Sequence, residues 1–261
     1  MIGIFDSGLG GLSVLNAIAG VLPRTDLTYI ADTAHVPYGE KNDDFIRQRA
    51  LAVSQHLIDR GCSQIVVACN TATAAAVTTL RETLPDVPII GIEPGIKPAA
   101  RVSKSGRIAV LTTTSTAHSK RLARLIEEHA KLVAVDILTC PGWADRVEAL
   151  QLCDNDFTET VRHHLQPTLD AGADQIVLGC THYAFLRPSL EPAIKGRATL
   201  VDVADAVARQ CVHMTSHSIF ETGQLILLAT AKPERLQTAL SALQLNHLLK
   251  KQHQPAQLIA V

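Results

Sequence analysis

Short apolar runs alternate with amphipathic stretches along almost the whole chain. The runs that predict strands are Ile2–Phe5, Leu27–Ala31, Ile65–Ala68, Ile89–Ile92, Ile108–Thr112, Leu132–Ile137, Ile176–Gly179, Leu200–Val203 and, near the end, Leu225–Ala229. Helical segments separate most of these runs. Strands that alternate with helices are typical of parallel sheets covered by helices on both faces, so the sequence predicts an α/β fold.

Several of the intervening segments show helical periodicity. Asp43–Arg60 places its apolar residues largely on one face and stops at Gly61, a residue suited to a left-handed helix cap. From Phe157 to Leu169 an apolar residue recurs at every fourth position. The chain is expected to be helical again after Val203, with a late helix at Glu234–Leu243. The last dozen residues predict a weakly ordered tail.

A short internal repeat divides the chain. Residues 60–71 align without gaps to residues 171–182, an offset of 111, and five of the twelve positions are identical, including Cys69 and Cys180. Each copy reads as a helix end, a glycine turn, a strand, and then a cysteine followed by polar residues. We therefore predict two similar parallel-sheet α/β domains with the active site in the cleft between them. The first domain would comprise residues 1–95 and 207–261, and the second residues 96–206.

Charge and composition exclude some classes of function. The 261 residues include 24 Lys and Arg against 25 Asp and Glu, a formal net charge of −1. This balance argues against a nucleic-acid partner, which usually requires a basic excess. No apolar run approaches the roughly 18 to 20 residues that a membrane helix needs. With no leader-like segment ahead of Asp6, we expect a cytoplasmic protein without a membrane partner.

The cysteines are the first candidates for chemistry. The chain has six of them, at positions 62, 69, 140, 153, 180 and 211. A chain of this size without a secretory leader predicts free thiols. The sequence contains no Cys-x-x-Cys motif, so a zinc site is not expected. Most of them are expected to be small buried apolar residues. Cys69 and Cys180 differ, because each follows a predicted strand at the end where ligands of parallel α/β sheets gather.

Two equivalent cysteines suggest a specific reaction. A cysteine beside a helix N-terminus gains from the positive end of the helix dipole, which favours the thiolate. Packing is the alternative role for one such residue, but two in a repeat indicate bases on opposite sides of one cleft. That arrangement suits racemisation or epimerisation, in which one thiolate removes an α-proton and the opposite thiol donates one. Hydrogen-bond donors to the substrate carboxylate would stabilise the carbanion without pyridoxal phosphate.

The glycine-rich segment Asp6–Ser13 admits two interpretations. Gly8-x-Gly10 after a strand, with Asp32 ending the next strand, imitates part of a dinucleotide-binding fingerprint. Ser13 stands where the third glycine of that fingerprint belongs, and Asp6 would place a carboxylate beside the pyrophosphate. Asp6 and Ser7 suit instead the ammonium group of an amino acid, or the orientation of a catalytic group.

A further loop, Pro37-Tyr38-Gly39, is hard to explain by packing alone. The chain has only three tyrosines, and this one lies beside a proline whose φ is fixed. We expect the loop to act as a substrate lid or clamp, and a structural turn is the alternative.

Five segments in order along the chain carry a family resemblance. They are Asp6-Ser-Gly-Leu-Gly-Gly-Leu-Ser13, Ala31-Asp-x4-Pro-Tyr-Gly-Glu-Lys41, Ala68-Cys-Asn-Thr-Ala72, Gly91-Ile-Glu-Pro94 and Gly179-Cys-Thr-His-Tyr183. Together they resemble the motif series of bacterial glutamate racemases, in the aspartate/glutamate racemase superfamily. The resemblance extends to about residue 245. It implies a cofactor-independent isomerase that supplies D-glutamate for peptidoglycan, with two α/β domains and commonly a homodimer.

The resemblance also implies roles for single residues. Cys69 and Cys180 are implied to be the acid/base pair, with Cys69 acting on the D-enantiomer and Cys180 on the L-enantiomer. The implied substrate contacts are Asp6, Ser7, Tyr38, Gly39, Asn70, Thr71, Thr181 and His182, while Asp6, Glu148 and His182 are implied to assist the thiols. Two departures from the family pattern lie at Ala184, usually proline, and Val203, often serine; both alter surroundings rather than a mapped group.

Two other functions stay open at this point. One is a racemase or isomerase for aspartate or another small diacid. Aspartate racemases tend to have a histidine two residues after Cys-Asn-Thr, where this chain has Thr73, and this favours glutamate. The other is a non-catalytic module that binds a dinucleotide or metabolite through Gly8-x-Gly10 and Asp32.

Overall fold

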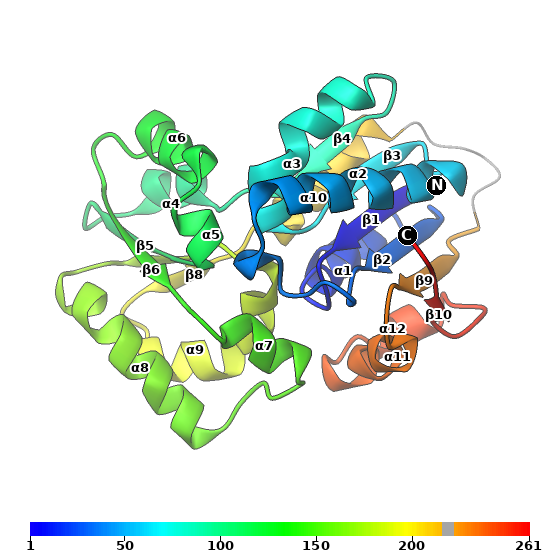
Figure 1. Ribbon diagram of the computed structural model, residues 1–261. Coiled ribbons are helices and arrows are strands. Elements are labelled where there is room, and N and C mark those ends of the chain that lie inside the picture. Colours follow the sequence, from blue (N-terminus) through cyan, green and yellow to red (C-terminus); the bar gives the residue numbers. More distant parts are fainter. Residues whose placement is uncertain (216–221) are drawn as a thin grey trace.

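The computed structural model describes residues 1–215 and 222–261. The chain forms two parallel sheets, each flanked by helices (Figure 1). The larger sheet has six strands in the order β10-β9-β2-β1-β3-β4. These strands are β1 (Ile2–Asp6), β2 (Leu27–Ala31), β3 (Gln64–Val67), β4 (Ile89–Gly91), β9 (Leu225–Ala229) and β10 (Gln257–Leu258).

The smaller sheet has four strands in the order β6-β5-β7-β8. They are β5 (Arg107–Thr112), β6 (Ala134–Thr139), β7 (Gln175–Leu178) and β8 (Thr199–Val201). Every pairing in both sheets is parallel. The predicted α/β class with two parallel sheets is therefore confirmed.

Helices connect the strands and cover the sheets. They are α1 (Leu12–Val21), α2 (Asp43–Asp59), α3 (Asn70–Thr83), α4 (Ile96–Val102), α5 (Thr114–Ala117), α6 (Lys120–His129), α7 (Trp143–Glu148), α8 (Asn155–Asp170), α9 (Arg187–Ile194), α10 (Ala204–Met214), α11 (Pro233–Ala242) and α12 (Asn246–Leu249), with 3-10 helices η1 (Tyr38–Glu40) and η2 (Thr181–Leu186). Helix α2 begins as its sequence predicts, because the Asn42 side chain accepts a hydrogen bond from the Phe45 amide. It ends before Gly61, whose φ of 88° is left-handed.

Each sheet lies between two apolar layers. Along β1 the side chains alternate, so that Ile2 and Ile4 join one buried cluster and Phe5 joins another on the opposite face. The first cluster is completed by residues of α1, α10 and α11, and the second by residues of α2 and α3. The smaller sheet repeats the arrangement with α7, α8 and α9 on one face and α4 and α6 on the other.

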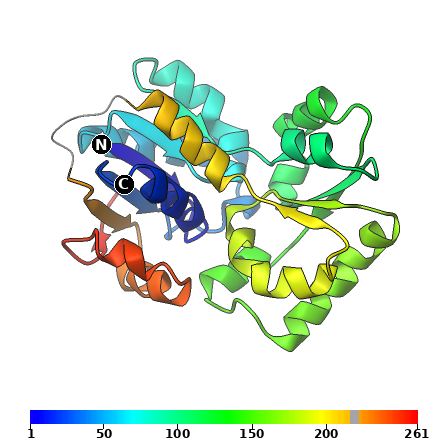
Figure 2. The same cartoon turned by 180° about the vertical axis from the view of Figure 1, so that it is seen from behind.

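The chain crosses between the two sheets twice, after β4 and after β8. Figure 2 shows β8 leading into α10, which returns to the larger sheet and packs against α1. The crossings lie against each other at Gly95, where an added Cβ would approach Val201 and Val203 to 3.0 Å. A larger residue at position 95 would push the crossings apart. The domain boundaries at residues 95–96 and 206–207 stay a prediction.

The structure corrects two expectations about order. The last dozen residues are not a loose tail: β10 pairs with β9, and the amide of Ile259 donates to the Ala229 carbonyl at 2.9 Å. The strand predicted at Leu132–Ile137 begins at Ala134, because Leu132 lies in a turn and is 95% exposed. Other strand ends shift by one or two residues.

The cysteines and the helices also bear on the sequence-based expectations. All six cysteines carry free thiols, and only Cys153 is exposed. Among the residues that the structure describes, no helix combines the length and the apolar character needed to cross a membrane.

Candidate active site

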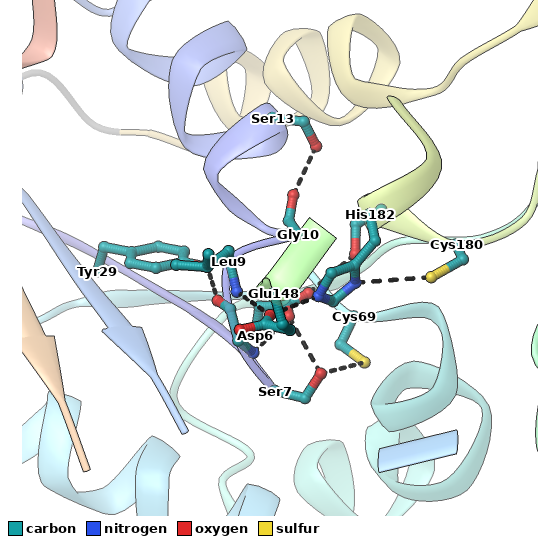
Figure 3. A network of polar contacts seen from close by, with 12 residues as sticks. Asp6, Ser7, Leu9, Gly10, Ser13, Tyr29, Cys69, Glu148, Cys180 and His182 are labelled. Atoms are coloured by element: carbon teal, nitrogen blue, oxygen red, sulfur yellow. Dashed lines mark hydrogen bonds and ion pairs between the residues drawn. The ribbon is translucent and has the colours of Figure 1, made fainter. Parts of the chain in front are cut away.

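The carboxyl ends of strands from both sheets meet at one place. Asp6 ends β1, Cys69 follows β3 and begins α3, and Cys180 follows β7 and begins η2. Figure 3 shows both sulfur atoms beside the polar side chains of this cluster. The cysteines are 6% and 7% exposed, and Asp6 is fully buried. The structure thus brings together the two cysteines that the repeat singled out, one from each sheet.

Cys69 lies in surroundings that keep its sulfur protonated. Its Sγ accepts a hydrogen bond from the Ala72 amide at 3.4 Å, at the N-terminus of α3, and donates to Ser7 Oγ at 3.9 Å. Burial, together with the nearby Asp6 carboxylate, raises the pKa of the Cys69 thiol far above its usual range. The hydrogen bonds with the Ala72 amide and the Ser7 hydroxyl offset this only in part, so Cys69 rests as a thiol.

Cys180 belongs to a chain of polar contacts that includes two charged groups. Its Sγ lies 3.7 Å from His182 Nδ1, and His182 Nε2 lies 2.7 Å from Glu148 Oε1. The same carboxylate oxygen accepts the Leu9 amide at 2.6 Å. Burial alone would lower the pKa of His182, but its hydrogen bonds to Cys180 and Glu148 outweigh burial and raise it. An imidazolium beside a sulfur atom stabilises the thiolate.

Asp6 connects the two sheets across the site. Its Oδ1 accepts the Gly8 amide at 2.8 Å and the Ser7 hydroxyl at 3.2 Å, and its Oδ2 accepts the Thr181 hydroxyl at 2.9 Å. Burial raises the pKa of Asp6, and the hydrogen bonds and the charge on His182 only partly oppose it. Asp6 and Thr181 therefore tie the first glycine loop to the loop that carries Cys180.

Asn70 is the side chain in this cluster that still lacks a partner. Both Oδ1 and Nδ2 are buried and unpaired, and the residue is 4% exposed. An unsatisfied buried amide costs about 1 to 3 kcal/mol, which a protein recovers when a ligand fills the gap. Asn70 therefore has a donor and an acceptor that are not used by the protein itself.

Beside the predicted contact Thr71 lie two hydroxyl residues, Thr113 and Thr116, that were not predicted as part of the site. Thr71 Oγ1 lies 3.1 Å from Thr113 Oγ1 and 3.2 Å from Thr116 Oγ1, both at the start of α5. The run of threonines after β5 was the available signal, but single hydroxyl residues are too common in loops to stand out. These contacts place polar groups of the smaller sheet against the α3 N-terminus.

The predicted clamp residues take different places. The Tyr38 hydroxyl donates to Asp32 Oδ2 at 2.6 Å, and the ring packs in the same buried cluster as Cys69. Gly39 faces the second sheet, because an added Cβ there would lie 3.0 Å from Thr113 Cβ. The loop contributes packing from Tyr38 and a close interdomain approach at Gly39.

The glycine loop is packed closely against Glu148 and His182, which leaves little room for a pyrophosphate. An added Cβ at Gly8 would lie 2.0 Å from Glu148 Oε1, and one at Gly10 would lie 2.4 Å from His182 Nδ1. The loop amides of Gly8 and Leu9 already donate to carboxylates. The glycines serve close packing against the catalytic candidates, and the dinucleotide interpretation loses its physical basis.

Comparisons with known proteins agree with this geometry. Residues 11–211 match the protein family described as Asp/Glu/Hydantoin racemase. The chain is 42% identical to the glutamate racemase of Pseudomonas aeruginosa over 246 residues, which are 93% of each chain. It is 44% identical to that of Ectopseudomonas mendocina over 229 residues, 88% of this chain and 84% of the relative.

Solved structures give the same picture. Escherichia coli glutamate racemase, in complex with L-glutamate and the activator UDP-MurNAc-Ala, matches with a TM-score of 0.84 and 31% identity over 93% of this chain and 94% of that one. The glutamate racemase of Thermus thermophilus in complex with β-chloro-D-alanine matches with a TM-score of 0.79 and 30% identity, over 100% and 96% of the two chains.

Proposed function

This chain belongs to the Asp/Glu/hydantoin racemase family as a glutamate racemase, an isomerase, and we propose that it exchanges the α-proton of glutamate through Cys69 and Cys180. The observation that carries the proposal is the opposite environment of two equivalently placed thiols. Cys180 lies beside a histidine of raised pKa, whereas burial and Asp6 raise the pKa of Cys69. Because an imidazolium favours a thiolate beside it, we propose Cys180 as the base and Cys69 as the acid of the resting site.

The charge states set the direction of the first step. The Cys180 thiolate removes the α-proton of L-glutamate, and the Cys69 thiol delivers its own proton to the opposite face to give D-glutamate. Each turnover leaves Cys180 protonated and Cys69 ionised, which is the form that acts on D-glutamate. Asp6 raises the energy of the Cys69 thiolate, so this second form returns readily to the first by reverse transfer or by exchange with water.

Other groups of the site bind substrate and stabilise the carbanion. The amides at the N-terminus of α3 and the free amide of Asn70 suit the α-carboxylate, whose extra charge they stabilise during proton removal. Asp6 and Ser7 suit the α-ammonium group. Because the cysteines and Asn70 are almost fully buried, we propose that the two domains separate at the crossings to admit substrate.

Circular dichroism of purified protein with L- or D-glutamate tests the proposal. We expect the signal of either enantiomer to decay toward zero without added cofactor, in the presence of EDTA or hydroxylamine. Iodoacetamide should abolish the decay, and saturating glutamate should protect. Turnover of aspartate but not glutamate would favour the diacid alternative, and full activity with both thiols alkylated, verified by mass spectrometry, would contradict the thiol mechanism.

The cellular role follows from the product. D-glutamate is a building block of peptidoglycan, so we propose that the enzyme supplies cell-wall synthesis from the cytoplasm. We further propose the two-domain division at residues 95–96 and 206–207, and a homodimer as the assembly. Chemical cross-linking, and light scattering to measure the mass of the protein in solution, would test the assembly.

A further inference from the structure

A continuous hydrogen-bonded network runs from Val261 to Tyr38, one of the predicted substrate contacts. The main-chain oxygen of Val261 accepts Arg49 Nη1 at 2.7 Å. Arg49 then donates to both oxygens of Asp32, from Nε at 3.0 Å and from Nη2 at 2.8 Å. Asp32 Oδ2 in turn accepts the hydroxyl of Tyr38 at 2.6 Å.

Asp32 is the fixed centre of this network. It is fully buried, and its Oδ1 also accepts the Thr230 hydroxyl at 2.8 Å, so four hydrogen bonds occupy the carboxylate. Burial alone would raise the pKa of Asp32, but the hydrogen bonds from Arg49, Tyr38 and Thr230 lower it. Asp32 is therefore ionised at neutral pH, and a fully occupied buried carboxylate holds each donor in one place.

Arg49 is the junction through which the end of the chain reaches Asp32. Its side chain is 13% exposed, and its guanidinium uses one edge for Asp32 and the remaining nitrogen for Val261. The terminal segment is itself anchored, because β10 pairs with β9 and Ile259 and Val261 pack on the buried cluster of α2 and α3. Its position therefore fixes the position of the guanidinium.

The other end of the network, Tyr38, shares a buried cluster with only one of the two thiols. Tyr38 and Cys69 belong to the same buried cluster, whereas Cys180 belongs to the cluster of the smaller sheet. The hydrogen bond to Asp32 fixes the Tyr38 ring within the cluster that contains Cys69. A change at the terminal segment should consequently alter Cys69 without altering Cys180.

We propose that residues 257–261 are a positioning element for Cys69, acting through Arg49, Asp32 and Tyr38. The proposal rests on the proposed function, in which Cys69 and Cys180 act on opposite enantiomers. The terminal segment does not touch substrate. It holds the guanidinium, and so the tyrosine ring, in the place where Cys69 has a single orientation toward the α-carbon.

The test needs a reaction in which each thiol acts alone. Racemisation cannot supply it, because enantiomers have equal free energy and kcat/KM must fall equally in both directions. Elimination from β-chloroalanine can: one thiolate removes the α-proton, chloride leaves the β-carbon, and the resulting 2-aminoacrylate hydrolyses to pyruvate and ammonium. The D-form requires Cys69 and the L-form requires Cys180, and coupled lactate dehydrogenase measures the pyruvate.

The variants are a chain ending at residue 256, Tyr38→Phe, and the two combined. We expect the truncation and Tyr38→Phe each to slow elimination from the D-form about fivefold, the effect of one lost hydrogen bond, with the L-form changed less than twofold. In the Tyr38→Phe background the truncation should cost nothing further, because both act on one network. Leu132→Ala is the matched control, since that side chain is 95% exposed and lies outside the network, so the change should leave both rates unchanged.

The outcomes separate the two proposals. If the truncation slows both enantiomers equally, leaves both unchanged, or adds fully to Tyr38→Phe, the terminal segment has no role in positioning Cys69. If the truncated chain is unstable, Arg49→Lys replaces it, because a lysine cannot hold Asp32 and the Val261 oxygen together. If Cys69→Ser affects both enantiomers of the analogue alike, the proposed function fails instead.

Discussion

Glu148→Gln removes the negative charge beside His182, the histidine next to Cys180, and keeps the shape of the side chain. Glu148 Oε1 accepts both His182 Nε2 and the Leu9 amide, at 2.7 and 2.6 Å, and the side chain is only 12% exposed. A glutamine oxygen can still accept the Leu9 amide. It cannot stabilise a positive charge on His182, so the imidazolium beside Cys180 is the group that loses support.

The size of the effect on the His182 imidazolium follows from its hydrogen bond to Glu148, which loses its negatively charged acceptor. A hydrogen bond to a charged group contributes about 1.5 to 3 kcal/mol, and little solvent screens this one. Taking about 2 kcal/mol, the imidazolium form that supports the Cys180 thiolate becomes about 30-fold less populated. Global stability should fall by less than about 1 kcal/mol, because the Leu9 amide keeps an acceptor.

The assay is elimination from the two enantiomers of β-chloroalanine across a range of pH. We expect the L-form, which uses Cys180, to slow about 30-fold, and the D-form, which uses Cys69, to change less than threefold. In the wild type, the imidazolium of His182 supports the thiolate beside it, so Cys180-dependent elimination should already be present at a pH below the raised pKa of His182. In Glu148→Gln the onset of this elimination should move to higher pH.

Glu127→Gln is the matched control, because Glu127 lies exposed on α6 and the same change of charge there should leave both rates unaltered. Equal slowing of both enantiomers in Glu148→Gln, or an unmoved pH profile, would refute the view that Glu148 acts through His182 on Cys180.

Three further predictions test the packing and charge of the site. Gly10→Ala should reduce kcat at least 100-fold, because its Cβ would lie 2.4 Å from His182 Nδ1, whereas Gly20→Ala, with open space around it, should stabilise α1 by about 0.5 to 1 kcal/mol in urea unfolding. Asn70→Ala should raise KM about tenfold yet leave the melting temperature unchanged or higher, since both amide atoms are unpaired without substrate. Asp32→Asn should cost about 3 kcal/mol at neutral pH. It should also flatten the acid loss of stability, because a carboxylate of lowered pKa stabilises above its unfolded pKa of about 4 and ceases to do so as the pH falls through its folded value.

Much of the fold could be predicted from the sequence, because burial of the strands produces a strong pattern of apolar residues. Strands of a parallel sheet covered on both faces read as continuous apolar runs, and the predicted Leu225–Ala229 strand matches β9 to the residue. The terminal strand β10 was missed, since Gln257 and Leu258 form only a two-residue edge strand with little burial. Its stability comes from β9 and Arg49, partners far away in the chain that no local pattern reveals.

The candidate site was likewise predictable in part: the positions of the two cysteines could be predicted, but their surroundings could not. The repeat placed Cys69 and Cys180 at equivalent strand ends, and parallel topology brings such ends together. Their different surroundings could not be inferred, because Asp6 comes close to Cys69, and the His182–Glu148 pair comes close to Cys180, only after folding. Contacts of this kind depend on side-chain direction as well as on position.

The most direct measurement of the two-thiol claim compares Cys69→Ser and Cys180→Ser with both enantiomers of β-chloroalanine. Serine is a far weaker acid and base than cysteine, so each variant should lose glutamate racemisation almost completely. Cys69→Ser should still eliminate chloride from the L-form through Cys180, and Cys180→Ser should still eliminate it from the D-form through Cys69. Loss of both forms in both variants, or racemisation at near wild-type rate by either, would contradict the account.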